Sequence, residues 1–390
     1  MQNIKSSVVQ LSTGHTGGAG LAARRLHAEL LQEGYDSEFY CIGRNDLTLE
    51  LKEYPINRNI VSKVGSRIAI ALNERFTRDI HFSVFSTNAV PLEFFKKLSK
   101  GKTRVLHFHN WQNLISTKNF VQLIQEGFPI VLTMHDERLI TGGCHYRLNC
   151  IENEGGCRAC PRASKLITRQ IQRGRDLLGN LDLTKFPNLH LVSPSLWLQG
   201  AALMNLSISE RQVSRIPNPL GPDWNTERYL LERTGEIAKN PRIGIATMSD
   251  SYTKYGDLVT KLLSDERFKR NYKVLFLRDF KPVGKSLPNF WKEIDLLLAL
   301  SRADNSPNSI VEAQSLGIPV LTSNVGGILE ILDSNGIALE PHEHNIENIL
   351  GGIRQIFNSQ RANLFDTGTA ATFSTHSITN VYSSVLDNLQ

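Results

Sequence analysis

Short apolar runs alternate along the chain with longer segments whose apolar residues recur at helical spacing. Each run is four to six residues long and is bounded by polar or turn residues, which is typical of buried strands. We predict strands at residues 7–12, 38–42, 104–109, 129–134 and 190–193 in the first half, and at 242–246, 273–277, 295–300 and 319–322 in the second. Strands that alternate with helices predict an α/β protein whose parallel sheets are covered on both faces.

The alternation restarts after a proline-rich segment. Residues 216–222 (IPNPLGP) hold three prolines and can form neither a helix nor a central strand. We therefore predict one domain over residues 1–215, a second over 216–375, and a C-terminal tail or helix over 376–390 that packs back on the first domain. Two doubly wound domains of this kind would place a ligand cleft between them, at the carboxyl ends of their strands.

Composition and charge narrow the class of protein. The 390 residues suffice for two cores, and 41% hydrophobic with 21% charged residues argues against disorder. We find no signal peptide and no apolar run long enough to span a bilayer, so we expect a cytoplasmic protein. A net charge of +6 suits an anionic ligand or surface.

The most informative segment surrounds two acidic residues. Asp304 and Glu312 are eight positions apart, and Ser306 with Pro307 predicts a helix start, with serine as cap and proline in the first turn. The helix would run to about Leu316. Its N-terminus would offer amides to a pyrophosphate, and the carboxylate could accept hydrogen bonds from a ribose. The alternative is an ordinary strand–loop–helix unit with surface acids.

A glycine-rich turn follows the first strand. Gly17 and Gly18 precede a helix predicted over residues 21–33, and backbone without side chains can approach a phosphate or a sugar closely. The turn matches neither a full dinucleotide fingerprint nor a Walker motif, and many α/β proteins have one like it.

Histidines gather at the ends of two further strands. His107, His109 and Trp111 follow one strand, and His135 with Asp136 follows the other. A single histidine is more often structural than catalytic. Because ligands bind at the carboxyl ends of such strands, we predict that this group reaches a ligand.

Together these segments resemble the retaining glycosyltransferases of family 4. Residues 302–332 (RADNSPNSIVEAQSLGIPVLTSNVGGILEIL) hold an acid, seven residues and Glu, followed by G-x-P-V and a GG turn. The PN within this segment resembles the subgroup that builds bacterial exopolysaccharides and related surface glycans. The TGGAG turn, T-x-H-D at residues 133–136, SPSLWL at 193–198 and IPNP at 216–219 occur in the expected order.

The resemblance implies the GT-B architecture, two Rossmann-like domains that face each other across a cleft. It also implies retaining transfer of a sugar from a nucleoside-diphosphate sugar to a glycan or lipid-linked acceptor, in polysaccharide or surface-glycan biosynthesis. No metal or other cofactor is implied for the chemistry. A sugar-nucleotide epimerase or phosphorylase of the same architecture is the main alternative enzyme.

The resemblance also assigns roles to residues. His135 and Asp304 would position the donor sugar, and Glu312 would hold the ribose. The leaving diphosphate would be stabilised by the Lys254 ammonium and by the backbone amides around Asn308 and Ser309. His107, His109, Trp111 and Asp136 form a second group of candidates for the cleft wall.

The chain departs from the family pattern at three positions. Asp304 stands where the family normally has Glu, and Pro219 replaces the usual glycine of the linker. The arginine expected about five residues before Lys254 is replaced by Ser249, although Arg278 or Arg302 could substitute for it. Because this arginine is missing, a second interpretation stays open, in which the protein binds nucleotide-sugars and is catalytically weak or inactive.

Four of the five cysteines lie within 17 residues, inside an insertion over residues 142–161. They are Cys144, Cys150, Cys157 and Cys160. Four thiols can close a tetrahedral zinc site, and clustering in a cytosolic protein favours metal ligands over disulfides. We predict a structural zinc site, with His145 as a substitute ligand; disulfides, free thiols and an iron–sulfur cluster are the alternatives.

Residues 158–175 hold six lysines or arginines and no acid. A solvated helix explains this charge. The alternative is a basic face for anionic lipid headgroups or a lipid-diphosphate acceptor, which would hold the protein at the inner face of the membrane. No nucleic-acid-binding motif accompanies the charge, so we expect no nucleic-acid partner.

Overall fold

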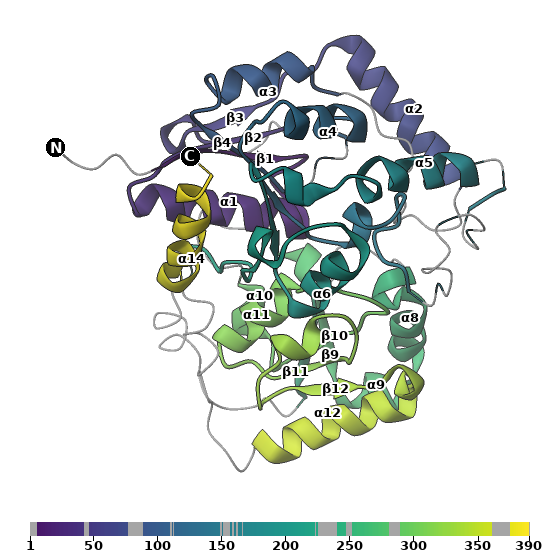
Figure 1. Ribbon diagram of the computed structural model, residues 1–390. Helices are drawn as coiled ribbons and strands as arrows, with labels where there is room; N and C mark the ends of the chain where they lie inside the picture. The colour runs from purple at the N-terminus through teal and green to yellow at the C-terminus, as the bar shows by residue number, and fades with distance from the viewer. Residues whose placement is uncertain are drawn as a thin grey trace. The chain divides into compact units, whose positions relative to one another are not determined.

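The computed structural model describes residues 6–42, 47–76, 89–109, 111, 113–148, 150, 157, 160, 163–165, 167–222, 224, 240–246, 252–280, 289–360 and 375–389. The chain divides into two compact units (Figure 1). Unit 1 comprises Met1–Pro219 together with His376–Gln390, and unit 2 comprises Leu220–Thr375.

Among the described residues, unit 1 has seven strands in one parallel sheet of order β3-β2-β1-β4-β5-β6-β7. The strands are β1 (Ser7–Ser12), β2 (Asp36–Cys41), β3 (Glu53–Pro55), β4 (Val105–Phe108), β5 (Ile130–Thr133), β6 (Leu189–Ser193) and β7 (Val213–Arg215). Strand order reverses between β1 and β4, so the loops that follow these two strands lie next to each other at the carboxyl edge of the sheet.

Helices cover this sheet and close two cores. They are α1 (Gly17–Gln32), α2 (Ile60–Phe76), α3 (Leu92–Leu98), α4 (Thr117–Gln125), α5 (Thr168–Gly179), α6 (Leu196–Asn205) and α14 (Thr375–Asp387). Short 3-10 turns include η1 (Leu49–Leu51), η2 (Glu137–Leu139), η3 (Leu183–Lys185) and η4 (Glu210–Gln212). Val9 and Leu11 enter one core while Val8 enters the other, so β1 is apolar on both faces.

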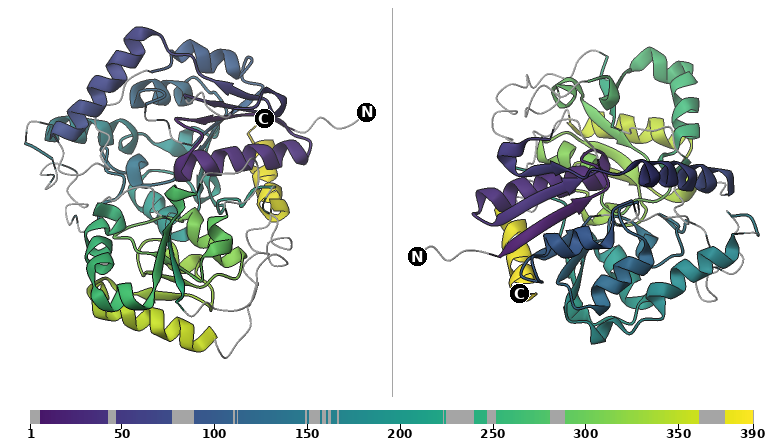
Figure 2. Two further views of the ribbon diagram at one scale, coloured as in Figure 1. Left: turned by 180° about the vertical axis from the view of Figure 1, so that it is seen from behind. Right: turned by 90° about the horizontal axis from the view of Figure 1, so that it is seen from above.

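The last helix of the chain belongs to the first unit. Ile378, Tyr382, Val385 and Leu386 of α14 are buried in the same core as Val8 and the residues of α1 that face the sheet. Figures 1 and 2 show α14, in yellow, beside α1, in purple. Full burial of an apolar side chain is favourable by roughly 1.5–3 kcal/mol, so α14 is an integral part of unit 1.

In unit 2, the described residues form a five-stranded parallel sheet of order β12-β11-β10-β8-β9. Its strands are β8 (Arg242–Ile245), β9 (Lys273–Phe276), β10 (Leu296–Ala299), β11 (Val320–Ser323) and β12 (Ile337–Leu339). Its helices are α8 (Gly256–Ser264), α9 (Glu266–Asn271), α10 (Phe290–Glu293), α11 (Asn308–Ser315) and α12 (Ile346–Gln360), with 3-10 turns η5 (Tyr252–Lys254), η6 (Leu277–Asp279), η7 (Ile328–Glu330) and η8 (Pro341–Glu343). The strand order reverses between β8 and β10.

The predicted α/β fold with two parallel sheets is confirmed, and each predicted strand forms within two residues of its predicted bounds. The predicted start of the helix after Asp304 is wrong by one residue. Pro307 has an extended ψ of 119° and occupies the N-cap, so α11 begins at Asn308 and Ser306 lies outside it. In the described part of the chain, no helix has the length and apolar composition required to cross a membrane.

Candidate active site

In unit 2, Lys254 and Asp304 lie on loops that follow two adjacent parallel strands, β8 and β10. The Lys254 ammonium donates to the Asp304 carboxylate and, over 3.2 Å, to Ser301 Oγ. The Asp304 side chain is 9% exposed, whereas that of Lys254 is 32% exposed. An ammonium that remains accessible beside a buried carboxylate can also contact an incoming anion.

The backbone of Asp304 is held by the glycine pair. Gly326 has a φ of +59°, and a Cβ at this position would lie 1.9 Å from the Asp304 carbonyl oxygen. The backbone N–H of Gly327 donates to that same oxygen over 3.2 Å. Position 326 therefore requires glycine, both for its left-handed backbone and for the close approach of another chain segment.

Helix α11 starts shortly after Asp304 and contains Glu312. The Glu312 side chain lies about one turn into the helix, and the residue is 6% exposed. Pro307 at the N-cap provides no side-chain hydrogen bond to the first turn. The positive end of the helix dipole favours an anion near this turn, and the buried carboxylate is a hydrogen-bond acceptor close by.

Arg302 is one of the two arginines that could substitute for the missing cation, and its guanidinium has partners within unit 2. Its guanidinium donates to Asp257 over 2.9 Å and lies 4.0 Å from the centroid of the Tyr255 ring. The Arg278 guanidinium lies 4.6 Å from the ring centroid of Phe276. Ser249, where the family arginine was expected, is outside the described residues.

In unit 1, the three histidines form two short hydrogen-bonded groups in a stack of rings. His109 Nδ1 lies 3.2 Å from His135 Nε2, and His109 Nε2 lies 2.7 Å from Gln10 Oε1. His107 Nε2 lies 2.7 Å from Thr133 Oγ1, and the rings of His107 and His109 are 4.1 Å apart. His107 and His109 are buried beneath His135, which is half-buried.

We call His107, His109 and His135 the histidine row. The Gln10 amide decides which ring nitrogens of His109 and His135 carry the protons. When Gln10 Oε1 accepts from His109 Nε2–H, His109 Nδ1 becomes an acceptor for His135 Nε2–H. The Nδ1 nitrogen of His135 is then left as an acceptor for a hydroxyl. The opposite orientation of the Gln10 amide reverses each donor, so this side chain decides which tautomer His135 adopts.

Burial keeps all three imidazoles neutral. It lowers the pKa of His107 to about 3 and that of His135 to about 4, where Asp136 opposes the shift. Burial also lowers the pKa of His109 well below its ordinary value, and the neighbouring imidazoles add to the effect. At pH 7 these groups can donate or accept hydrogen bonds, but they provide no positive charge.

Asp136 is committed to Arg138. The Arg138 backbone N–H and Nε donate to Asp136 Oδ1 over 3.0 and 2.8 Å, and Nη2 lies 2.7 Å from Oδ2. Burial would raise the pKa of Asp136, but Arg138 and His145 together lower it. Asp136 therefore acts on His135 as a nearby negative charge and caps η2.

The remaining candidates of the N-terminal half divide into packed and open positions. Trp111 is 5% exposed and stacks on Phe120 with ring centroids 5.4 Å apart, which places it in the core. Gly17 and Gly18 are exposed at the start of α1, and a Cβ at either would meet nothing within 4 Å. Gly20, in contrast, packs against the Gly14 carbonyl, where a Cβ would lie 2.4 Å from the oxygen.

Three of the four clustered cysteines pack around one small apolar group. Cys144, Cys157 and Cys160 contact the buried pair Ile167 and Ile171. All five cysteines of the chain are described, and none is joined in a disulfide. Among the residues placed by the structure, no three His, Cys, Asp or Glu side chains are grouped to hold a metal ion. The zinc site stays a prediction.

The cysteine-rich segment is anchored next to the histidine row. The Glu137 carboxylate accepts from the backbone N–H and the Nε of Arg147, both over 2.6 Å. Its own backbone N–H donates to the His145 carbonyl over 2.8 Å. Because Glu137 is 2% exposed, this pairing fixes the segment against η2.

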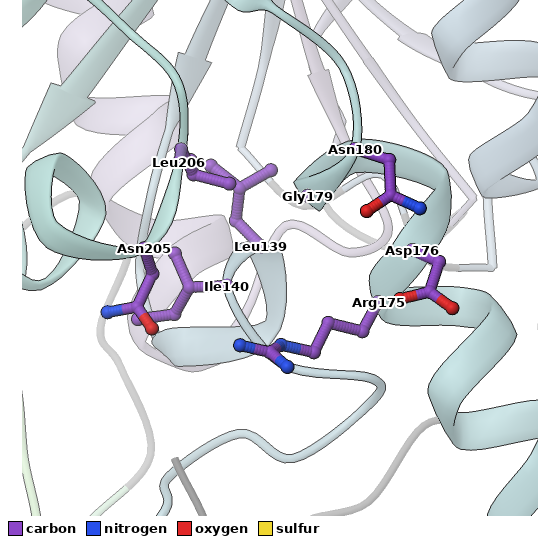
Figure 3. A pocket seen from close by; sticks show the side chains of 8 residues that line it. All are labelled: Leu139, Ile140, Arg175, Asp176, Gly179, Asn180, Asn205 and Leu206. Carbon is purple, nitrogen blue, oxygen red and sulfur yellow. The ribbon is translucent and has the colours of Figure 1, made fainter. Parts of the chain in front are cut away.

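A cavity of ≈ 130 Å³ lies in the same region of unit 1. It is lined by Leu139, Ile140, Arg175, Asp176, Gly179, Asn180, Asn205 and Leu206. Figure 3 shows apolar side chains of Leu139, Ile140 and Leu206 together, with polar groups at the ends of α5 and α6 around them. The sequence did not predict this site, because its lining depends on how the ends of two helices meet η2.

Comparison with known proteins identifies the class. The model of the family described as glycosyl transferases group 1 matches residues 236–358. Over 351 residues the chain is 26% identical to the "Putative colanic acid biosynthesis glycosyl transferase WcaC" of Escherichia coli (strain K12), an alignment that covers 82% of this chain and 83% of that protein.

Two solved structures show the fold. HepE of Anabaena, determined with UDP-glucose, superposes with a TM-score of 0.61 at 13% identity and covers 98% of this chain and 100% of its own. WaaG, a glycosyltransferase involved in lipopolysaccharide biosynthesis, gives a TM-score of 0.61 at 12% identity, covering 98% and 99%.

Residues 236–358 belong to the group 1 glycosyltransferases, and the chain has the GT-B fold. Within that group it is related to WcaC along most of its length. The predicted family, fold and enzyme class are confirmed.

Proposed function

We propose that this enzyme transfers a sugar from a UDP-sugar to a hydroxyl of a glycan or lipid-linked glycan during surface-polysaccharide biosynthesis, with retention of configuration. The observation that carries the proposal is the Lys254–Asp304 pair beside the N-terminus of α11. The names of the relatives support it further. WcaC is assigned to colanic acid biosynthesis, and HepE has been determined with UDP and with UDP-glucose.

In the proposed complex, the donor diphosphate lies over the start of α11. Lys254 contacts the phosphates, together with the backbone around Asn308 and Ser309, and so stabilises the negative charge that develops on the leaving diphosphate. The Glu312 carboxylate accepts hydrogen bonds from the ribose hydroxyls. Asp304, freed from part of its contact with Lys254, accepts from a hydroxyl of the donor sugar.

His135 acts on the sugar as a neutral group. With a pKa of about 4 it offers a hydrogen bond to a hydroxyl of the transferred sugar and does not balance phosphate charge. Gln10 and His109 hold its tautomer, so we assign them as positioning residues. Gly17 and Gly18 leave open space at the start of α1, where a sugar or phosphate can approach the backbone.

The donor site is tested by thermal melting with UDP, ADP, GDP, dTDP and their glucose conjugates. A ligand at 100 times its Kd stabilises the native state by about 2.7 kcal/mol, so UDP should raise Tm by several degrees. The Glu312→Ala variant should lose this shift. Glu266→Gln, which changes an exposed acid on α9, is the matched control. No shift with any nucleotide at saturating concentration contradicts the donor site.

A nucleotide-sugar-binding protein without transferase activity is the second candidate, favoured by Ser249 in place of an arginine. Binding and turnover are separated by the release of UDP from the donor that gives the largest Tm shift. Slow hydrolysis without acceptor, abolished by Glu312→Ala, supports the transferase. Binding with no release of UDP, with or without membrane-glycan extract, supports the second candidate.

We infer that part of the acceptor binds in the cavity of unit 1. Arg175, Asp176 and Asn205 offer the charged and amide groups that recognise sugar hydroxyls. Asn205→Ala should raise the acceptor KM several-fold and leave the UDP-induced Tm shift unchanged, since a lost hydrogen bond costs about 0.5–1.5 kcal/mol. An unchanged acceptor KM would remove this cavity from the proposal.

A further inference from the structure

Helix α2 directs large apolar side chains to the outside of unit 1. Ile60, Val61, Val64 and Ile68 are 78%, 79%, 48% and 54% exposed. Positions 60, 64 and 68 are four residues apart and Val61 lies beside them, so the four form one stripe along the helix. We call these four residues the α2 stripe. A contiguous exposed apolar stripe of this kind marks an interaction surface.

The opposite face of the same helix is small and polar. Among the α2 residues whose burial is described, Ser66 and Ala69 are buried, at 5% and 4% exposure. Ser66 Oγ donates to the Ser62 carbonyl over 2.9 Å and accepts from Arg58 Nη1 over 3.2 Å. The Ser66 hydroxyl is therefore hydrogen-bonded where the helix packs. In the described part of α2, small residues face the core and bulky apolar residues face outward, which reverses the usual pattern of an amphipathic helix.

The helix begins at a well-formed N-terminus. Asn59 Oδ1 accepts from the Ser62 backbone N–H over 2.8 Å, and the Asn59 carbonyl accepts from Lys63 N–H over 3.1 Å. An amide side chain at this position is a strong helix start. The outward stripe is therefore presented by an ordered helix. In Figures 1 and 2, α2 lies at the periphery of unit 1.

Basic side chains border the stripe. Lys63 and Arg67 are exposed and four residues apart, so they form a row along one edge of it. The sequence of α2 holds three basic residues and one acid. Apolar side chains flanked by a basic row are the pattern of helices that lie in the interface of an anionic membrane.

We propose that α2 docks unit 1 on an anionic lipid bilayer, with the α2 stripe inserted among the acyl chains and Lys63 and Arg67 on the phosphates. The proposal is independent of the sugar donor and of the cavity. It also differs from the predicted contact through residues 158–175. Of the described residues there, α5 exposes Arg169 and Arg173, and the large apolar residue that α5 exposes, Leu177, lies beyond the segment. The described part of the segment therefore offers charge and little apolar surface to insert.

The basic row favours a membrane over a second copy of the chain. If two copies paired through their α2 stripes, the Lys63 and Arg67 rows would line the same seam. The exposed residues described on α2 include no acid to pair with them. Like charges along one seam oppose association, whereas anionic phosphates complement both rows.

The first test is flotation of the full chain with lipid vesicles. We expect binding to vesicles of phosphatidylcholine mixed with phosphatidylglycerol and weak binding to phosphatidylcholine alone. The double variant Val64→Gln/Ile68→Gln should bind the mixed vesicles at least about tenfold more weakly, because it removes inserted apolar area. Met204→Gln, which changes an apolar residue that is 80% exposed on α6, is the control and should bind like the wild type.

The second test separates charge from insertion. Lys63→Gln/Arg67→Gln should weaken binding to the mixed vesicles by about tenfold or more and should leave the weak binding to phosphatidylcholine unchanged. All variants alter exposed side chains, so their Tm values should match that of the wild type. Equal vesicle binding by the wild type and Val64→Gln/Ile68→Gln overturns the proposal. A wild-type dimer in sedimentation that this variant disperses, without vesicle binding, assigns the stripe to a second copy.

Discussion

At the scale of single residues, the Lys254–Asp304 pair is the part of unit 2 that we propose to contact the donor. Replacing Lys254 with methionine would remove the proposed charge-assisted hydrogen bond to the donor diphosphate, and such a bond contributes about 1.5–3 kcal/mol. We expect kcat/KM to fall roughly 10- to 100-fold. The measurement is the initial rate of UDP release at sub-saturating donor. Lys269→Met, on the exposed surface of α9, should keep the wild-type rate.

Gly326 makes a second prediction at this scale. Gly326→Ala places a methyl group against the Asp304 carbonyl in a left-handed backbone, so the loop that carries Asp304 must move. We expect a loss of about 1–3 kcal/mol in unfolding free energy and a loss of nucleotide-induced stabilisation. Gly351→Ala is the control, because a Cβ there meets nothing within 4 Å. In the helix α12 it should be neutral or stabilising, by up to about 1 kcal/mol.

The histidine row predicts a pH dependence of stability. His107 and His135 have folded-state pKa values of about 3 and about 4, below the ordinary value of 6.5. Between these values and pH 6.5 the unfolded chain binds more protons than the folded chain, so the unfolding free energy falls as the pH falls. The stabilisation is complete above about pH 6.5 and decreases toward pH 4. Urea unfolding at several pH values measures the slope.

The matched variants for this prediction are His135→Gln and His342→Gln. The first removes the half-buried imidazole whose pKa is about 4 and should flatten the slope between pH 6.5 and 4. The second changes an exposed histidine of unit 2 and should keep the wild-type slope. Identical slopes for wild type and His135→Gln would contradict the lowered pKa of His135.

In unit 2, the sequence predicted the secondary structure around Asp304 and Glu312 but not the contacts that these residues make. The spacing of Asp304 and Glu312 predicted a loop and a helix, which the structure contains. It did not predict that the Gly326 backbone touches Asp304, because that contact joins loops after different strands. His109 was predicted only as a candidate for the cleft wall. Its position between Gln10 and His135 depends on the pairing of β1 with β4.

At the scale of elements, the strands that the sequence missed share one physical cause. β3, β7 and β12 are three residues long and lie at sheet edges. Three residues are too few to stand out as an apolar run in the sequence, whereas β9, which also lies at an edge, has four residues and was predicted. The central strands are buried on both faces and were predicted from their apolar runs.

The cysteine-rich segment carries a prediction at this scale. We expect the purified protein to hold one zinc ion per chain, detected by elemental analysis, and Cys157→Ser/Cys160→Ser to lose it. Cys41→Ser changes the cysteine that lies outside the cluster, within the first sheet, and should retain the metal. Chelation should then lower the Tm of the wild type, because ligand binding to the native state stabilises it. A metal-free wild type with the same Tm as the double variant contradicts the zinc site.

At the scale of the whole molecule, unit 1 is built from two distant parts of the chain. Tyr382 of α14 places its hydroxyl 3.3 Å from Thr133 Oγ1, which in turn contacts His107. The helix thus covers one core and also touches the group of residues beneath His135. Unit 2, in contrast, is a continuous segment.

This arrangement fixes an order of events during synthesis. A ribosome releases every described strand of unit 2 before it releases α14. Unit 2 can therefore fold while unit 1 still lacks this helix. Until α14 emerges, the sheet face that carries Val8, Val105 and Val131 lacks its last cover. A nascent chain at that stage exposes apolar surface that chaperones recognise. A chain that stops before α14 would contain the whole of unit 2 and a unit 1 that lacks one of its core helices.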